Sequence, residues 1–153
     1  MTDPVTIVFA EDDEGHATLV ERNLRRAKIP AKSVRVRDGQ ELLDYMQRRG
    51  PWESRPDNAA MLILLDLNMP RIGGLEALDR LKADPRFAHI PIIVLTTSDN
   101  AAELEHCYAS GAAACIVKPV EFGLFGDMVQ RLGDFVTMAR LPAETPPPET
   151  RAS

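Results

Sequence analysis

The sequence predicts an α/β domain of three layers, a doubly wound parallel sheet of five strands with helices on both faces. Two observations lead to this prediction. Five short apolar runs rich in β-forming residues alternate with stretches of helical periodicity, which implies right-handed βαβ units. The length of 153 residues suits one domain of this kind. The number of units matches the flavodoxin-like arrangement, with strand order 2-1-3-4-5.

The five predicted strands are the apolar runs themselves. The first, third and fourth runs are almost continuously hydrophobic, which is typical of strands buried on both faces of a parallel sheet. The second run alternates with Arg35 and Arg37, and this alternation places it toward an edge of the sheet. The runs are Val5–Ala10, Ser33–Val36, Met61–Leu65, Ile92–Leu95 and Ala114–Val117.

Five helices are predicted between and after these runs. The fourth spans residues 101–110, with Ser98 or Asp99 as its N-cap and Gly111 as its C-cap. The last helix runs from about Glu121 to about Met138. The first three show apolar residues at a period of about 3.6. These residues are Ala17, Leu19, Val20, Leu24 and Ala27, then Leu42, Leu43 and Met46, then Leu75, Leu78 and Leu81.

The predicted domain covers residues 4–140, and a proline-rich tail covers residues 141–153. The composition changes after Leu141 to Pro142, the proline triplet 146–148 and Glu149. Such a segment is expected to be extended or disordered, because it carries too little apolar surface to form a core of its own.

Charge and composition exclude several classes of protein. The net charge is −5, and a mildly acidic chain without a basic tract is a poor binder of nucleic acid. No apolar run reaches the ~18 residues of a membrane helix, and no secretory signal is visible. Cys107 and Cys115 are too few for a disulfide framework. We expect a cytoplasmic protein that binds neither nucleic acid nor membrane. Its acidic surface is better suited to a metal ion or to a basic surface of a partner protein.

Chemically active side chains follow four of the predicted strands. Ligands in this architecture collect beyond the carboxyl ends of the strands, so these side chains are expected to meet at one edge of the sheet. They are Glu11 and Asp12 after the first strand, Asp66 after the third, Thr96 after the fourth and Lys118 after the fifth; Asp13, which follows Asp12, is expected to be the N-cap of the first helix.

The chemistry of this set points to a metal and to phosphoryl transfer. Clustered carboxylates repel one another unless a cation joins them, and oxygen ligands suit a hard divalent ion such as Mg²⁺. An aspartate can also act as a nucleophile toward phosphorus and form an aspartyl-phosphate. Such a transfer needs positioning and charge neutralisation, for which Lys118 supplies a positive charge and Thr96 a hydrogen bond.

Four motifs follow one another in this order, each at the end of a predicted strand, within the stretch from Val5 to Met138. They are the acid pair Glu11-Asp12, the run Asp66-x-Asn68-Met69-Pro70, Thr96, and the pair Lys118-Pro119. With these motifs the chain resembles the receiver domain of two-component response regulators.

The resemblance implies that Asp66 accepts a phosphoryl group from a sensor histidine kinase. It also implies that Mg²⁺ is bound by Asp12, Asp66 and the backbone carbonyl of Asn68, with Glu11 reaching the metal through water, and that the bond before Pro119 is cis. Such a module is not an enzyme in the metabolic sense, since it catalyses only its own phosphorylation and dephosphorylation. Only about a dozen residues follow the last predicted helix, so a single-domain regulator that signals by protein–protein contact is expected.

Two segments indicate a particular group within the response regulators. Residues 91–98 and 135–142 are similar to the stand-alone regulators that partner bacterial phytochromes, so a bacteriophytochrome is the expected kinase. The chain departs from the general family pattern at Cys115, where many receivers carry an aromatic residue that takes part in switching.

Two other functions use similar residues. A phosphatase of the haloacid dehalogenase type also places aspartate, threonine and lysine around Mg²⁺, and it is the alternative. That class carries an Asp-x-Asp motif after the first strand, whereas Asp66 follows the third predicted strand and Asn68 stands two residues later. A flavin carrier would need a phosphate loop rich in Ser, Thr and Gly after the first strand, where the acids of this chain would repel a phosphate.

The last predicted helix carries more apolar surface than one core needs. Its apolar arc covers about 200°, against about 100° for a helix that faces a single core. Either the tail that begins with Leu141 and Pro142 folds back over the second stripe, or the helix and tail form a homodimer, which is the expected outcome. The first stripe is Phe125, Val129, Leu132 and Val136; the second is Leu124, Met128, Phe135 and Met138, flanked by Phe122 and interrupted by Arg131.

Overall fold

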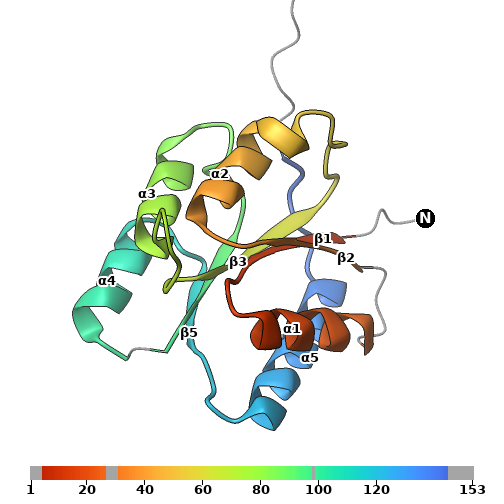
Figure 1. Cartoon of the computed structure of the whole chain (residues 1–153), viewed down its shortest axis with the longest axis vertical. Coiled ribbons are helices and arrows are strands. Elements are labelled where there is room, and N and C mark those ends of the chain that lie inside the picture. Colours follow the sequence, from red (N-terminus) through yellow and green to blue (C-terminus); the bar gives the residue numbers. More distant parts are fainter. Residues whose placement is uncertain (1–4, 27–30, 98, 145–153) are drawn as a thin grey trace, which may run out of the picture.

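A computed structural model describes residues 5–26, 31–97 and 99–144. Its sheet has five parallel strands in the order β2-β1-β3-β4-β5, so the predicted topology is confirmed (Figure 1). β2 lies at an edge, as its alternating charges predicted. The strands are β1 (Val5–Ala10), β2 (Ala31–Val36), β3 (Met61–Asp66), β4 (Ile92–Thr96) and β5 (Ala114–Val117).

The helices form a layer on each face of the sheet (Figure 1). α1 (Glu14–Arg26) and α5 (Phe122–Met138) pack side by side on one face. α2 (Gly39–Gln47), α3 (Gly74–Ala83) and α4 (Ala101–Ala109) lie on the other, and a short 3₁₀ helix, η1 (Gly50–Trp52), follows α2. The three predicted layers are therefore present, and none of the helices described is long and apolar enough to span a membrane.

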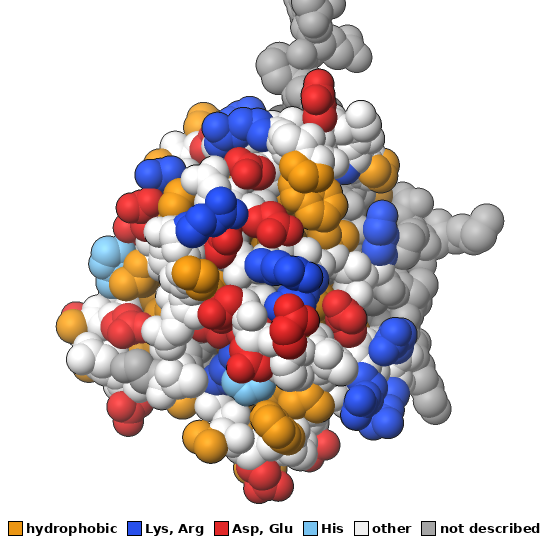
Figure 2. All heavy atoms as spheres, in the orientation of Figure 1, with side chains coloured by type: hydrophobic (Ala, Val, Ile, Leu, Met, Phe, Trp, Pro, Cys, Tyr) orange, Lys and Arg blue, Asp and Glu red, His pale blue; other side chains and the backbone are white. Residues whose placement is uncertain are grey.

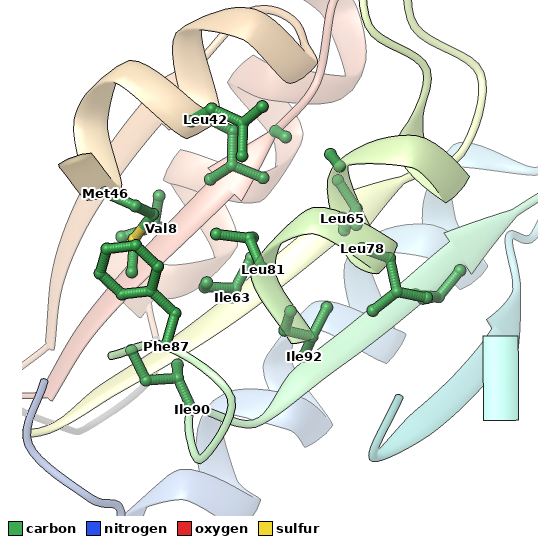
Figure 3. Packing of buried hydrophobic residues seen from close by; sticks show 14 of the residues in the cluster. Val8, Leu42, Met46, Ile63, Leu65, Leu78, Leu81, Phe87, Ile90 and Ile92 are labelled. Atoms are coloured by element: carbon green, nitrogen blue, oxygen red, sulfur yellow. The ribbon is translucent and has the colours of Figure 1, made fainter. Parts of the chain in front are cut away.

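One hydrophobic core lies between the sheet and α2, α3 and α4. Val8, Ile63 and Ile92 point from three adjacent strands toward Leu42 of α2 and Leu78 of α3 (Figure 3). All five side chains are fully buried. The 3.6-residue period seen in the sequence therefore marks the buried faces of these helices.

A second core lies between the sheet and the pair α1 and α5. Phe9 and Leu64, which alternate with the residues of the first core along β1 and β3, meet Val20 of α1 and Phe125 of α5 here. Because strands buried on both faces contribute to both cores, β1, β3 and β4 read as continuous apolar runs in the sequence.

The ends of α4 correct two predictions. Asn100 is the N-cap, and its side chain accepts a hydrogen bond of 3.1 Å from the backbone N–H of Glu103. Asp99 is therefore not the cap, while Ser98 lies outside the described residues. Asp99 and Asn100 are both preferred N-cap residues, so residue preference alone does not decide which of these neighbours caps the helix. The C-cap is Ser110 rather than the predicted Gly111, which follows it with a φ of 105°, the left-handed conformation common for a glycine just after a helix.

The first residues of the tail lie against the domain rather than over α5. Leu141 packs against the second core, which lies between the sheet and the pair α1 and α5, and the carbonyl of Pro142 accepts a hydrogen bond of 3.1 Å from the N–H of Met61. Leu141 and Pro142 therefore do not cover the second apolar stripe, where Phe135 is 52% and Met138 79% exposed, and the rest of the tail lies outside the described residues. This hydrogen bond gives a partner to the backbone N–H at the start of β3.

Candidate functional site

The predicted site residues meet at the carboxyl edge of the sheet. Asp66 ends β3, Thr96 ends β4, and Glu11 and Lys118 directly follow β1 and β5. The parallel register brings these ends together: Ala10 pairs with Leu65, Asp66 with Leu95 and Thr96 with Val117. The side chains arise from four strands because every strand of a parallel sheet ends on the same side.

Lys118 stands between two buried carboxylates. Its Nζ donates a hydrogen bond of 2.8 Å to Oδ2 of Asp66 and a second hydrogen bond to Oε1 of Glu11. The exposed fractions of the three side chains are 2% for Lys118, 6% for Asp66 and 4% for Glu11. One ammonium therefore pairs with two acids in a place that excludes water, where charges interact strongly.

Burial and pairing shift two pKa values in this group. Burial raises the pKa of Glu11 to about 7, with the nearby charge of Asp66 acting in the same direction and the hydrogen bond from Lys118 opposing it. Burial disfavours the charged form of Lys118, but its hydrogen bonds to Asp66 and Glu11 prevail and raise the pKa of its ammonium. Lys118 is thus a permanent cation. Its single positive charge stands beside two carboxyl groups, so the site can accept a second cation.

Asp12 joins these carboxylates at the surface. Glu11, Asp12 and Asp66 each offer a carboxylate oxygen, and these oxygens lie within 4.8 Å of one another. Asp12 is exposed while the other two are buried, so the cluster opens to solvent on one side. Three hard oxygen donors around one point fit the ligand preference of Mg²⁺.

Asn68 is held beside Asp66 by the loop between β3 and α3. Its backbone N–H donates to Oδ1 of Asp66 at 2.9 Å, and its side-chain amide donates to Oγ1 of Thr97 at 3.2 Å. The Asn68 backbone therefore lies next to the acidic cluster, as its predicted role requires.

Thr96 lies in the site but its side chain is engaged with α4. The residue is fully buried, and its hydroxyl donates to Oε1 of Glu103 at 3.4 Å. Its carbonyl accepts a hydrogen bond of 2.6 Å from the N–H of Lys118. The threonine thus connects the β5 end of the site to α4.

Two contributors lie outside the predicted set. Arg35 of β2 donates through Nε and Nη2 to the carbonyl of Glu11, at 3.1 and 3.0 Å, and so supports the loop after β1. His16 of α1 stacks on the ring of Phe125, and its Nδ1 lies 3.6 Å from Oε1 of Glu11. The sequence around Arg35 and His16 gives no pattern that would predict a contact with Glu11. The alternation around Arg35 predicts only that this residue lies on an edge strand.

The bond between Lys118 and Pro119 is trans, because no cis peptide bond occurs in the part of the chain that the structure describes. The cis bond implied by the resemblance is therefore wrong for this structure. The trans form is the one that a Pro bond favours by about 0.5–1 kcal/mol in the absence of other constraints.

Comparison with known proteins agrees with this geometry. A model of the response regulator receiver domain matches residues 7–130. Response regulator Rcp1 of Synechocystis is 32% identical over 132 residues, which make up 86% of this chain and 88% of Rcp1. The crystal structure of the Mn²⁺-bound form of Rcp1 has a TM-score of 0.85 and covers 92% of this chain and 100% of that chain.

Two other solved structures are similar over most of the chain. The phosphorylated cyanobacterial phytochrome response regulator RcpA has a TM-score of 0.85 at 31% identity and covers 92% of this chain and 99% of its own. The bacteriophytochrome response regulator AtBRR has a TM-score of 0.69 at 36% identity, with coverages of 86% and 94%. These matches do not support the alternative of a haloacid-dehalogenase-like phosphatase. The chain therefore belongs to the response regulator receiver domain family, whose members receive signals from sensor histidine kinases.

Proposed function

We propose that this protein is a phosphorylation switch that takes a phosphoryl group from a sensor histidine kinase onto Asp66. The contact of 2.8 Å between Lys118 Nζ and Asp66 Oδ2, beside the carboxylates of Glu11 and Asp12, is the observation that supports it. A carboxylate oxygen of Asp66 forms the new bond to phosphorus while the bond from phosphorus to the kinase imidazole breaks. The switch turns over no metabolite.

Each residue of the site has a separate role in phosphoryl transfer. Asp12, Asp66 and the backbone carbonyl of Asn68 would hold Mg²⁺, with Glu11 contributing through water, and the bound ion would supply positive charge for the phosphoryl oxygens. Lys118 supplies a second, fixed positive charge from inside the domain. Thr96 supplies a hydroxyl hydrogen bond once it turns from Glu103. Positioning and charge neutralisation of this kind are what phosphoryl transfer requires.

The test is chemical phosphorylation of the intact chain. With acetyl phosphate and Mg²⁺, the protein should gain one phosphoryl group, which peptide mapping should place on Asp66, and EDTA should prevent the gain. A phosphoryl group on another residue, or an undiminished gain in EDTA, would overturn the proposal.

Asp12→Ala should weaken Mg²⁺ binding about tenfold or more, measured by titration calorimetry, because it removes a direct oxygen ligand. Asp13→Asn is the matched control. It removes the same charge from the neighbouring position, while an asparagine oxygen can still cap α1 by accepting from the N–H of His16, as Asp13 does at 2.9 Å. An Asp12→Ala protein that binds Mg²⁺ like the control would remove Asp12 from the ligands.

We further propose that the partner is a bacteriophytochrome kinase and that the protein acts in the cytoplasm. The similarity to RcpA and AtBRR, both phytochrome response regulators, supports this partner. We also propose that residues 4–140 form the receiver domain and residues 141–153 its tail, with output through protein contacts and no direct contact with DNA. Phosphotransfer should be faster from a phytochrome kinase of the same organism than from its other histidine kinases.

A homodimer through α5 is also proposed. Figure 2 shows apolar side chains at the lower edge of the view, over the start of α5, where Phe122 is 61% exposed. Leu124, Phe135 and Met138 are exposed as well, while Met128 is half-buried. Several large apolar side chains exposed along one helix are typical of a protein interface.

Phe135→Glu should convert this dimer into a monomer, because it places a charge inside the apolar strip. Sedimentation velocity at about 100 µM should show a dimer for the unaltered chain and a monomer for the variant. Ala83→Glu, at an exposed position of α3 on the opposite face of the sheet, should leave the dimer intact. An unaltered chain that sediments as a monomer would refute the dimer.

A further inference from the structure

An ion pair outside the acidic cluster joins two loops at the site edge of the domain. Arg71, in the loop between β3 and α3, donates from Nε to Oδ2 of Asp38 at 2.7 Å and from Nη2 to Oδ1 at 3.0 Å. Asp38 is buried at the N-cap of α2, where Oδ1 also accepts from the N–H of Glu41 at 2.8 Å. This two-point geometry fixes direction as well as distance.

The backbones of the same two loops are also in contact. The N–H of Gly39 donates to the carbonyl of Ile72 at 3.1 Å. A Cβ atom on Gly39 would lie 2.1 Å from that carbonyl oxygen, so the approach requires glycine at this position. The loop between β3 and α3 is thus tied to the start of α2 by adjacent residues, Arg71 through its side chain and Ile72 through its backbone.

Arg71 makes this contact from an unfavourable backbone conformation. Its φ is 63°, in the left-handed region that disfavours residues with a side chain. Such a conformation persists only where surrounding contacts hold it, and the bond to Asp38 is one that does so. The loop therefore has a shape that its own sequence does not favour.

That loop carries Asn68, three residues before Arg71. At its start the N–H of Asn68 donates to Asp66, and at its end the N–H of Gly74 donates to the carbonyl of Leu67 at 3.1 Å. Between these two points, the contacts with Asp38 and Gly39 attach the loop to α2. A displacement of Arg71 would thus also move the Asn68 backbone, because only two residues separate them in a loop that is held at both ends.

We propose that Arg71 and Asp38 are positioning residues of the metal site, which hold the β3–α3 loop so that the Asn68 carbonyl stays in place for Mg²⁺. The inference rests on the proposed function, because Asn68 is a metal ligand only there. Neither residue contacts the acids of the cluster in the structure; both act through the loop. Outer residues that orient a ligand commonly affect metal affinity about 10- to 100-fold.

The test is Mg²⁺ binding by Arg71→Gln, measured by titration calorimetry. The change in charge by itself can only tighten cation binding, because it removes a positive charge from the domain. The loss of the contact should weaken it, by about tenfold at the low end of outer-residue effects. The two influences have opposite signs, so the direction of the change separates positioning from simple charge.

Two further variants complete the design. Arg80→Gln removes the same charge from α3, where Arg80 pairs with Glu76 at 3.0 Å on the exposed surface, and it should not weaken Mg²⁺ binding. Asp38→Asn keeps an N-cap oxygen for α2 but loses the ion pair, so it should weaken binding as Arg71→Gln does. The double variant should be no weaker than either single variant, since both remove one contact.

Amide hydrogen exchange supplies a second readout. Exchange at Gly74 should be faster in Arg71→Gln than in Arg80→Gln, because the loop opens more often. An Mg²⁺ affinity of Arg71→Gln equal to or tighter than that of Arg80→Gln would overturn the inference while leaving the proposed function intact. An unaltered protein that binds no Mg²⁺ would overturn both.

Discussion

Asp66→Asn should abolish phosphorylation of this protein by acetyl phosphate and by a histidine kinase. The amide has almost the same shape as the carboxylate, and its oxygen can still accept the hydrogen bond that Lys118 gives to Asp66 at 2.8 Å. It is not a nucleophile of useful strength toward phosphorus, because its lone pair is delocalised. The fold should survive, so a loss of labelling reports on chemistry.

The measurement is intact-mass spectrometry combined with hydroxylamine treatment, which cleaves an acyl phosphate. The unaltered protein should carry a label that hydroxylamine removes, and Asp66→Asn should carry none. Asp127→Asn, which alters an exposed residue of α5, should be labelled normally. Hydroxylamine-sensitive labelling that persists in Asp66→Asn would assign the acceptor to another carboxylate.

Glu144→Ala should destabilise the fold by about 3–5 kcal/mol, the typical effect of removing one partner of a buried ion pair. Arg55 donates to both carboxylate oxygens of Glu144 at 2.8 and 2.9 Å, and the N–H of Asn58 donates at 2.7 Å. The exposed fractions of the side chains are 5% for Arg55 and 2% for Glu144. Without its partner, the guanidinium stays buried over the ring of Tyr45, 4.2 Å from its centre.

The contribution of Glu144 should also depend on pH. Burial opposes its ionisation, but the hydrogen bonds from Arg55 and Asn58 prevail and hold the pKa of Glu144 below its ordinary value. The unfolded value is about 4.3, so the stabilisation is complete above that pH and is lost as the pH falls through the lower, folded pKa. Glu144→Gln should therefore be less stable than the unaltered chain at neutral pH, and the difference should shrink in acid.

Urea unfolding of each variant, followed from pH 7 downward, measures both effects. Glu105→Ala, which changes an exposed glutamate of α4, should alter the free energy of unfolding by no more than about 0.5 kcal/mol. A Glu144→Ala protein as stable as this control would show that the ion pair with Arg55 contributes nothing to the stability of the fold.

Much of the site could be predicted because it depends on local patterns. The runs that became β1, β3 and β4 are continuously apolar, which identifies strands buried on both faces. Once such strands are parallel, whatever follows them lies at one edge of the sheet, so Glu11, Asp66 and Lys118 had to be neighbours. The alternation around Arg35 likewise placed β2 at the edge.

Capping and the Lys118-Pro119 bond were less predictable. Asp99 and Asn100 have similar capping tendencies, and only the path of the chain out of β4 selects Asn100. The trans bond before Pro119 differs from what the family resemblance implied. In both cases the competing states differ by little energy, so the surrounding structure decides between them.

The sequence by itself thus determined where the strands lie along the chain and which acids, threonine and lysine follow them, because periodicity is a local property and parallel strands all end at one edge of the sheet. Only the tertiary structure decided which of these charges pair. Lys118 and Glu11 are 107 residues apart, Arg55 and Glu144 are 89 apart, and Arg71 and Asp38 are 33 apart. No local sequence pattern encodes such pairs, because their contact depends on how loops from different strands pack together. A charged residue in a loop has the same local conformational preferences with or without an ion-pair partner.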